Sequence, residues 1–236
     1  MLRCETGWVP GSYGQYCPIA RGAEIFAERW TPVIVRNILL GCETFTQIQR
    51  GAPGIPRSLL VQRLGRLERY GVVERDVERG RVRYRPTEAG RELWSVCEAL
   101  GVWGARWLEA APEHLDPYVA LWSMCNNLAQ DRLPAMRTVV RLEFRNSPTR
   151  VDRFWLLLEG GHGEVCAKAP GEEDLLVRAD AERFVRWHMG HLSWRAASAG
   201  GGIEVTGPRD LVRAFPNWNR RSSFRDVHPV RVSRTS

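Results

Sequence analysis

The sequence predicts an α+β fold in two domains, the first mainly helical with one hairpin and the second built from strands and helices. Two observations lead to this fold class. Apolar residues recur at helical spacing over residues 17–70, and two short β-prone runs flank the turn Glu78-Arg79-Gly80-Arg81. Over residues 138–169, apolar runs of strand length are separated by a glycine-rich turn. A chain of 236 residues is long enough for two ordinary domains.

The composition is that of a globular protein and argues against a membrane-spanning, secreted or metal-binding protein. Hydrophobic residues make up 44% of the chain and charged residues 26%. The sequence has no run of about 18 apolar residues, so we expect no membrane span. Residues 1–14 lack the apolar core of a secretory signal, and we therefore expect a cytoplasmic protein. The six cysteines form no C-x-x-C pair and no Cys/His cluster, which favours free thiols and predicts neither a metal nor a cofactor.

Positive charge is concentrated in one short stretch. Residues 50–85 contain ten arginines against four acidic residues, an excess of six charges in a chain whose net charge is +7. Clustering of this kind favours a polyanionic partner such as a nucleic acid. The alternative is a solvated basic face without a partner.

The first domain contains five predicted helices with clear start or stop signals. They cover residues 17–30, 31–40, 45–50, 57–70 and 87–108. Threonines cap three of them, at Thr31, Thr44 and Thr87, and prolines stand in the first turn of the first two. Gly71 follows the fourth helix, where a left-handed glycine commonly ends a helix.

The fourth helix has one apolar and one polar side. Leucines at positions 60, 64 and 67 form the apolar stripe. The polar side carries Ser58, Gln62, Arg63, Arg66 and Arg69. A short helix, a tight turn, such an amphipathic helix and then a basic hairpin is the order of a winged helix-turn-helix, whose recognition helix lies in the major groove of DNA. Taken alone, the helix fits an ordinary amphipathic surface helix better, and it is the arginine-rich hairpin after it that makes DNA binding the stronger interpretation.

The helix from residue 87 carries more apolar surface than a small DNA-binding domain can bury. Its stripe is formed by Leu93, Val96, Cys97, Leu100, Trp103, Gly104 and Trp107. Two interpretations remain open for this surface, a dimer interface or packing against the second domain.

Several motifs occur in a fixed order between residues 14 and 107. They are Tyr16-Cys17-Pro18-Ile19-Ala20-Arg21, Arg29-Trp30-Thr31-Pro32-Val33-Ile34-Val35-Arg36, Gly54-Ile55-Pro56, Leu60 with Leu64, Leu67-Glu68 and Gly71-Val72-Val73, and Tyr84 with Thr87 and Gly90. With these motifs the chain resembles the HxlR-type family of bacterial winged-helix regulators. The resemblance implies a homodimer that binds inverted-repeat operators in double-stranded DNA and has its first and last helices at the dimer interface.

The resemblance also assigns DNA contacts by position. It implies Thr44, Thr46 and Gln47 on the supporting helix, Arg57, Ser58, Gln62, Arg63 and Arg66 on the recognition helix, and Arg79, Arg81 and Arg83 in the wing. In this family a cysteine matching Cys17 can sense oxidants or electrophiles. A thiol at a helix N-terminus is favoured as the thiolate, which makes redox sensing an alternative mode of regulation and simple packing the other interpretation.

The second domain is predicted from alternating strands and helices. Residues 14–110 form the first domain, 111–132 a linker with a connecting helix, 133–219 the second domain, and 220–236 a basic, disordered tail. Strands are expected at 138–144, 153–159, 164–169, 175–178 and 203–207, and helices at 181–189 and 208–215. This order, with Asp180 capping a helix and an Ile-x-Val-x-Gly strand at Ile203, resembles the sterol-carrier-protein-2-like fold. That resemblance implies a cavity for a small apolar effector.

Aromatic and histidine residues are the candidates for a second site. Four tryptophans could line a ligand pocket, namely Trp122, Trp155, Trp187 and Trp194. Tryptophan is more often a core residue, and that interpretation stays open. His162, His188 and His191 lack the Asp, Glu or Cys partners of a metal or catalytic set.

These observations lead to a dimeric, sequence-specific transcriptional regulator, acting as a repressor and responding to an apolar effector. An enzyme is not expected, because the sequence contains no G-x-S-x-G, H-E-x-x-H, P-loop or dinucleotide motif. A lipid carrier is the remaining alternative, and the arginine cluster argues against it.

Overall fold

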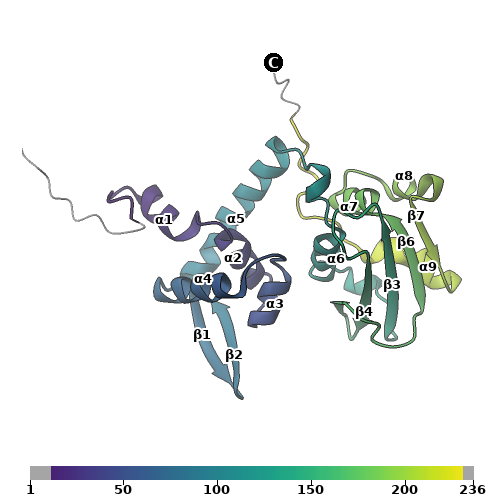
Figure 1. The fold of residues 1–236 in the computed structure, drawn as a ribbon, viewed down its shortest axis with the longest axis horizontal. Coiled ribbons are helices and arrows are strands. Elements are labelled where there is room, and N and C mark those ends of the chain that lie inside the picture. The colour runs from purple at the N-terminus through teal and green to yellow at the C-terminus, as the bar shows by residue number, and fades with distance from the viewer. Residues whose placement is uncertain (1–11, 231–236) are drawn as a thin grey trace, which may run out of the picture. The chain divides into compact units, whose positions relative to one another are not determined.

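The computed structural model describes residues 12–230 and divides the chain into two compact units, residues 1–99 and 100–236 (Figure 1). Residues 231–236 of the predicted tail lie outside the described residues. Each unit has its own elements and its own core, as the predicted α+β class requires.

The first unit is a helical domain with one hairpin. Its elements are α1 (Pro18–Phe26), α2 (Thr31–Leu39), α3 (Phe45–Arg50), α4 (Arg57–Arg69), β1 (Val73–Glu78), β2 (Arg81–Pro86) and α5 (Glu88–Trp107), the last of which continues into the second unit. The core includes the three leucines of α4 together with Ile34, Ile38 and Ile48. The predicted helix-turn-helix and hairpin are therefore present in the predicted order.

Local signals explain most of the helix ends. The Thr44 hydroxyl accepts a hydrogen bond from the backbone of Gln47 at 3.3 Å, and Thr87 caps α5 by accepting one from Gly90 at 3.1 Å. Gly71, with φ of 67°, ends α4 in a Schellman motif, in which Val72 N–H donates to the Leu67 carbonyl at 2.9 Å.

The expected cap at Thr31 is wrong. Thr31 is the first residue of α2, and the N-cap is Trp30, whose φ is 77°. The left-handed turn at Trp30 starts the helix one residue earlier than the threonine signal indicates. As a result the Thr31 hydroxyl is buried without a hydrogen-bond partner among the described residues.

The hairpin closes on a two-residue turn. The last paired residues are Glu78 and Arg81, so Arg79 and Gly80 form the loop, with φ of 51° and 77°. Two consecutive residues with positive φ match a type I′ turn, whose twist suits the two strands. Arg79 and Gly80 therefore form the tip of the hairpin, and Figure 1 shows this hairpin of β1 and β2 extending from the helices of the first unit.

The second unit is a mixed five-stranded sheet with helices. Its elements are α6 (Pro117–Cys125), β3 (Thr138–Arg145), β4 (Arg153–Glu159), β5 (His162–Cys166), β6 (Leu175–Asp180), α7 (Ala181–Met189), α8 (Trp194–Ser198), β7 (Ile203–Thr206) and α9 (Arg209–Trp218), with short 3-10 turns at Pro112–His114, Gln130–Arg132 and Ala199–Gly201. The strand order is β5-β4-β3-β6-β7, in which β3 and β6 are parallel and the other neighbours antiparallel. Helix α8 was not predicted from the sequence.

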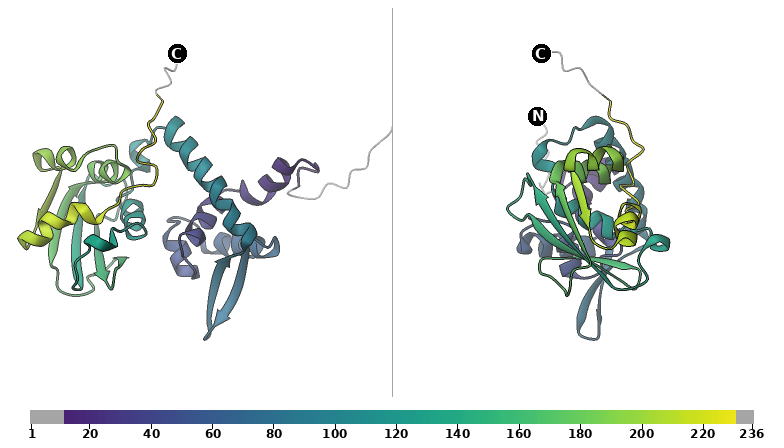
Figure 2. Two further views of the ribbon diagram at one scale, coloured as in Figure 1. Left: turned by 180° about the vertical axis from the view of Figure 1, so that it is seen from behind. Right: turned by 90° about the vertical axis from the view of Figure 1, so that its right-hand side faces the viewer.

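One face of this sheet is apolar and the other is charged. Val140, Leu142 and Phe144 alternate on β3 and belong to the core, and seen from behind α6 and α9 lie in front of the strands (Figure 2). Arg141 and Glu143 alternate with them on the opposite face, where they form an ion pair. The core therefore lies between one face of the sheet and its helices.

The segment after α9 is ordered as far as residue 230, whereas the sequence predicts a disordered tail from Arg220. Ser222 N–H donates to the His188 carbonyl at 2.8 Å, and Val230 N–H donates to the Arg106 carbonyl at 2.8 Å. Basic composition alone does not reveal these backbone bonds. We call residues 219–230 the C-terminal strap.

Candidate nucleic-acid interface

The outward stripe of α4 lies opposite its buried leucines. Ser58, Val61, Gln62 and Arg69 are exposed on it, and Gly65 stands among them. Two of the predicted contacts, Ser58 and Gln62, are therefore available to a partner. Val61, whose exposed fraction is 57%, also lies on the stripe, although its apolar side chain did not mark it as a candidate contact.

Two other predicted contacts, Arg63 and Arg66, are turned away from this stripe. Both guanidinium groups form ion pairs with the Glu28 carboxylate, which follows α1 in the chain. Arg66 also donates to the carbonyl of Glu24 at 2.7 Å, and Arg63 to that of Arg29 at 3.5 Å. The side chain of Arg66 is only 21% exposed and that of Arg63 only 15%. A helical projection placed them on the polar side, but it cannot show that a distant carboxylate holds them on the flank of the helix.

The start of α4 and the supporting helix α3 provide a second set of polar groups. The Arg57 guanidinium lies 4.6 Å from the centre of the Phe45 ring, a cation–π contact that leaves the residue exposed. Thr44 and Gln47 form a capping box, in which the Gln47 side-chain oxygen accepts from the Thr44 backbone at 3.0 Å. Thr46 is exposed. Thr44 and Gln47 thus have a structural role in addition to the predicted contact.

The wing separates its arginines into two groups. Arg79 and Arg81 are exposed at the tip. Arg83 forms ion pairs with Glu43 and Glu78, and Arg85 lies 2.7 Å from Glu78. These charges tie the base of the hairpin to the loop before α3.

Glu43 is the centre of that network. The hydrogen bond from Arg83 lowers the pKa of its carboxyl, and Arg85 acts in the same direction. Its backbone carbonyl also accepts from Tyr84 N–H at 2.7 Å. Glu43 therefore fixes the wing relative to the helix-turn-helix. No local pattern in the sequence indicates this role, because Glu43 and its arginine partners are about 40 residues apart.

Apolar surface is exposed on α1 and α5. Tyr16 and Ile19, at the start of α1, are 98% and 83% exposed. On α5 the exposed apolar residues are Trp94, Val96, Leu100, Trp103 and Trp107. The half-buried Cys17 is the N-cap of α1. Exposed apolar surface of this kind on α1 and α5 is suited to a protein partner.

The four candidate tryptophans do not form one pocket. Trp187 is in the core, with its ring 5.0 Å from that of Trp194. Trp155 lies on the charged face of the sheet, where its Nε1 donates to Glu173 at 2.8 Å. Trp122 is buried on α6. Trp187 and Trp194 are in ring contact, and they pack against Phe215 as part of an aromatic cluster.

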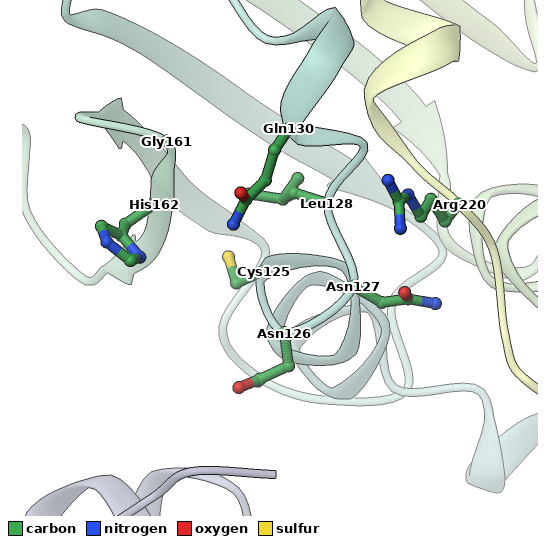
Figure 3. A pocket seen from close by; sticks show the side chains of 8 residues that line it. All are labelled: Cys125, Asn126, Asn127, Leu128, Gln130, Gly161, His162 and Arg220. Atoms are coloured by element: carbon green, nitrogen blue, oxygen red, sulfur yellow. The ribbon is translucent and has the colours of Figure 1, made fainter.

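A separate depression lies beside the end of α6 and the β4–β5 turn. Its lining is formed by Cys125, Asn126, Asn127, Leu128, Gln130, Gly161, His162 and Arg220. Figure 3 shows His162 and Arg220 on opposite sides, with Cys125 and Leu128 between them. Most of these side chains are polar, and burial raises the pKa of the Cys125 thiol to about 12. This depression does not match the apolar cavity that the sequence predicts.

The described residues hold no group of three or more His, Cys, Asp or Glu side chains able to bind a metal. Over residues 12–230, none of the helices combines the length and apolarity needed to cross a membrane.

Comparison with known proteins identifies relatives of the first unit. Residues 25–112 match the family described as HxlR-like helix-turn-helix. The HTH-type transcriptional regulator YvaP of Bacillus subtilis is 31% identical over 106 residues, which cover 43% of this chain and 96% of that protein. The HTH-type transcriptional regulator Mb3122 of Mycobacterium bovis is 37% identical over 116 residues, covering 42% of this chain and 72% of that one. Among solved structures, the reduced form of the transcriptional regulator YodB from B. subtilis is 29% identical, with 40% of this chain and 97% of that chain covered and a TM-score of 0.36.

Proposed function

The chain belongs to the HxlR-like helix-turn-helix family, and we propose that it is a sequence-specific DNA-binding transcriptional regulator that acts as a homodimer on an inverted-repeat operator. The observation that carries this proposal is the outward stripe of α4 beside a wing with exposed arginines. A stripe with Ser58 and Gln62 can enter the major groove, while Arg79 and Arg81 reach phosphates or the minor groove. Repression would follow where the operator overlaps a promoter, because the bound dimer excludes polymerase.

Fluorescence anisotropy with the duplex upstream of the protein's own gene tests this function. Across a salt series we expect nanomolar, sequence-selective binding whose affinity falls steeply as salt rises. The double variant Arg79→Ala with Arg81→Ala is expected to weaken binding to all sequences. Because the homodimer has two wings and so loses four arginines, the salt slope should fall by about four. Absence of binding at low salt on this duplex and on duplexes selected from a random library would contradict the proposal.

We propose α1 and α5 as the dimer interface. The exposed apolar side chains of these helices support it, with Ile19 and Trp103 as test positions. Ile19→Asp and Trp103→Asp are each expected to shift the sedimentation coefficient towards the monomer and to weaken operator binding. Val77→Asp, which alters an exposed valine of β1, is the matched control and should leave the assembly unchanged.

The second domain is proposed as the receptor of a small apolar effector, with the sterol-carrier-like arrangement as its fold. What supports this is the aromatic cluster around Trp187, with partly buried Trp194 at its edge. A ligand would have to displace one of these rings, because they are in contact. Titration with a fatty acid and with a sterol, followed by tryptophan fluorescence, should give saturable binding that Trp194→Ala weakens. A stoichiometric co-purified lipid together with no DNA binding would favour a lipid carrier instead.

Redox regulation through Cys17 is the second candidate mode. One observation favours it. Cys17 is the N-cap of α1, and Glu24 in the last turn of α1 accepts a hydrogen bond from Arg66 of α4. A displacement of α1 can therefore change the position of the recognition helix. Oxidant treatment is expected to lower operator affinity in the wild type and not in Cys17→Ser. Cys97→Ser is the control, because burial raises the pKa of the Cys97 thiol and makes its thiolate scarce. Equal loss of affinity in Cys17→Ser would reject this mode.

A further inference from the structure

The outward stripe of α4 differs from the arginine-rich surface that composition predicts. Over its first three turns it presents Ser58, Val61, Gln62 and Gly65, and an arginine, Arg69, appears on it only in the last turn. Base edges in the major groove are usually contacted from the N-terminal part of a recognition helix. Beside the exposed Arg57 at the first position of α4, the side chains that the stripe itself offers to bases are therefore a hydroxyl, an isopropyl group and an amide.

The arginines in the middle of α4 are unavailable for the contact that arginine most often makes, a bidentate pair with guanine. To reach a base, Arg63 and Arg66 would have to leave Glu28. Arg66 would also have to release the Glu24 carbonyl. That movement would leave the Glu28 carboxylate without its two arginine partners, which is electrostatically unfavourable.

Val61 and Gln62 stand side by side on the stripe and have complementary chemistry. An exposed valine in the major groove can contact the C5-methyl group of thymine, and a glutamine amide can pair with N6 and N7 of adenine. Both groups belong to A·T pairs. Val61 is 57% exposed, so an apolar partner would remove a large part of its surface from water.

Gly65 lies one turn beyond Val61 on the same stripe. A glycine inside a helix is destabilising by about 0.5–1 kcal/mol relative to alanine. A Cβ at this position would meet no described atom within 4 Å, so packing inside the protein does not require glycine. Because Gly65 has no side chain, the backbone of α4 can instead approach another surface closely.

From these observations we propose that α4 reads A·T base pairs, with Val61 on a thymine methyl group, Gln62 on an adjacent adenine and Gly65 allowing the helix to approach the base edges. This inference rests on the proposed function, because it presupposes that α4 enters the major groove. It names Val61 as a specificity-determining residue.

Selection of duplexes from a random library with the full chain gives the site, and single-atom changes in that site then test the contacts. Each thymine of the half-site is replaced in turn by deoxyuridine, which removes only the methyl group. At one position the affinity should fall about fourfold for the wild type, the effect of one buried methyl group. For Val61→Ala the same replacement should have little effect. Val77→Ala, a substitution of an equally exposed valine on β1, should keep the wild-type response.

Replacement of adenine by 7-deazaadenine tests Gln62 in the same way. It removes the N7 acceptor and should lower wild-type affinity about tenfold at one position while leaving Gln62→Ala insensitive. If the library yields an enriched sequence, but no deoxyuridine or deazaadenine replacement in it changes the affinity of the protein, the inference is overturned. The regulator function then remains intact. Failure of the library to yield any enriched sequence would instead remove the proposed function, and the inference with it.

Discussion

Nδ1 of the His188 imidazole lies 3.1 Å from the side-chain oxygen of Asn219, and this pair fastens the start of the C-terminal strap to α7. The same oxygen accepts from Arg221 N–H at 2.8 Å. Because an amide oxygen only accepts, His188 must donate through Nδ1. His188 is 3% exposed, and its Nε2 has no hydrogen-bond partner among the described residues. The neutral imidazole is therefore the form that suits this site.

Acidification is expected to destabilise the second domain through His188. Burial lowers the pKa of this imidazole below its usual value of about 6.5. The unfolded chain consequently binds a proton before the folded one does, so stability is full above about pH 6.5 and falls as the pH decreases from there towards the folded-state pKa. Thermal unfolding at pH 7.5, 6.5 and 5.5 should show this loss. In His188→Gln the loss should be smaller, whereas the exposed-site control His162→Gln should follow the wild type.

Removal of the Glu43 charge should change specificity more than stability. Glu43→Gln weakens the ion pairs with Arg83 and Arg85, which are about one-third exposed, so the loss of stability should be about 1 kcal/mol or less. The freed arginines and the added positive charge should strengthen binding to scrambled DNA and steepen its salt dependence. Anisotropy with operator and scrambled duplexes measures the ratio of the two affinities, and this specificity ratio should fall. Glu74→Gln removes the same charge from an exposed position on β1, and an equal change there would show that net charge alone is responsible.

A buried amide holds the helix-turn-helix together. Asn37 is fully buried, donates to the Ile48 carbonyl at 2.9 Å and accepts from the Arg36 guanidinium at 2.8 Å. Asn37→Ala should lower the stability of the first domain by about 1–3 kcal/mol, because it leaves buried polar groups without this partner. Denaturant unfolding checks the value, with exposed Gln62→Ala as the control. A change below about 0.5 kcal/mol would mean that water replaces the amide.

Sequence predicted the elements well, because their signals are local. Thr44, Thr87 and Gly71 stand where caps and stops were expected, and β4 begins and ends as its apolar run indicates. Thr31 was misassigned because the left-handed conformation of Trp30 leaves no mark in the residue types. The five-residue helix α8 is too short to show a helical period.

Side-chain roles were harder to predict, because they depend on distant partners. Nothing near Arg63 and Arg66 in the sequence indicates that Glu28, almost 40 residues away, holds them. For Trp155 a usable signal existed. It alternates with Phe154 and Leu156 on one strand, so period two already places it on the face opposite the core.

Gly65→Ala is expected to separate stability from binding. Alanine should raise the stability of the first domain by about 0.5–1 kcal/mol, since the added methyl meets no described atom within 4 Å. The same methyl should weaken operator binding if α4 approaches the bases closely. Thermal unfolding measures the change in stability, and anisotropy on the same preparation measures the change in operator affinity. Increased stability with unchanged affinity would show that the glycine has no part in DNA contact.

Gly101→Ala and Gly104→Ala should have opposite signs, although both replace a glycine of α5. A Cβ at Gly104 meets no described atom within 4 Å, and alanine there should stabilise the helix by about 0.5–1 kcal/mol. A Cβ at Gly101 would overlap the Phe224 ring of the C-terminal strap. Gly101→Ala should therefore displace the strap, lower the thermal midpoint of the second domain and expose residues 219–230 to proteolysis. In a Phe224→Ala background the clash is gone, so the same substitution should become stabilising. A destabilising effect that persists in that background would mean that Gly101 is required for another reason than its contact with Phe224.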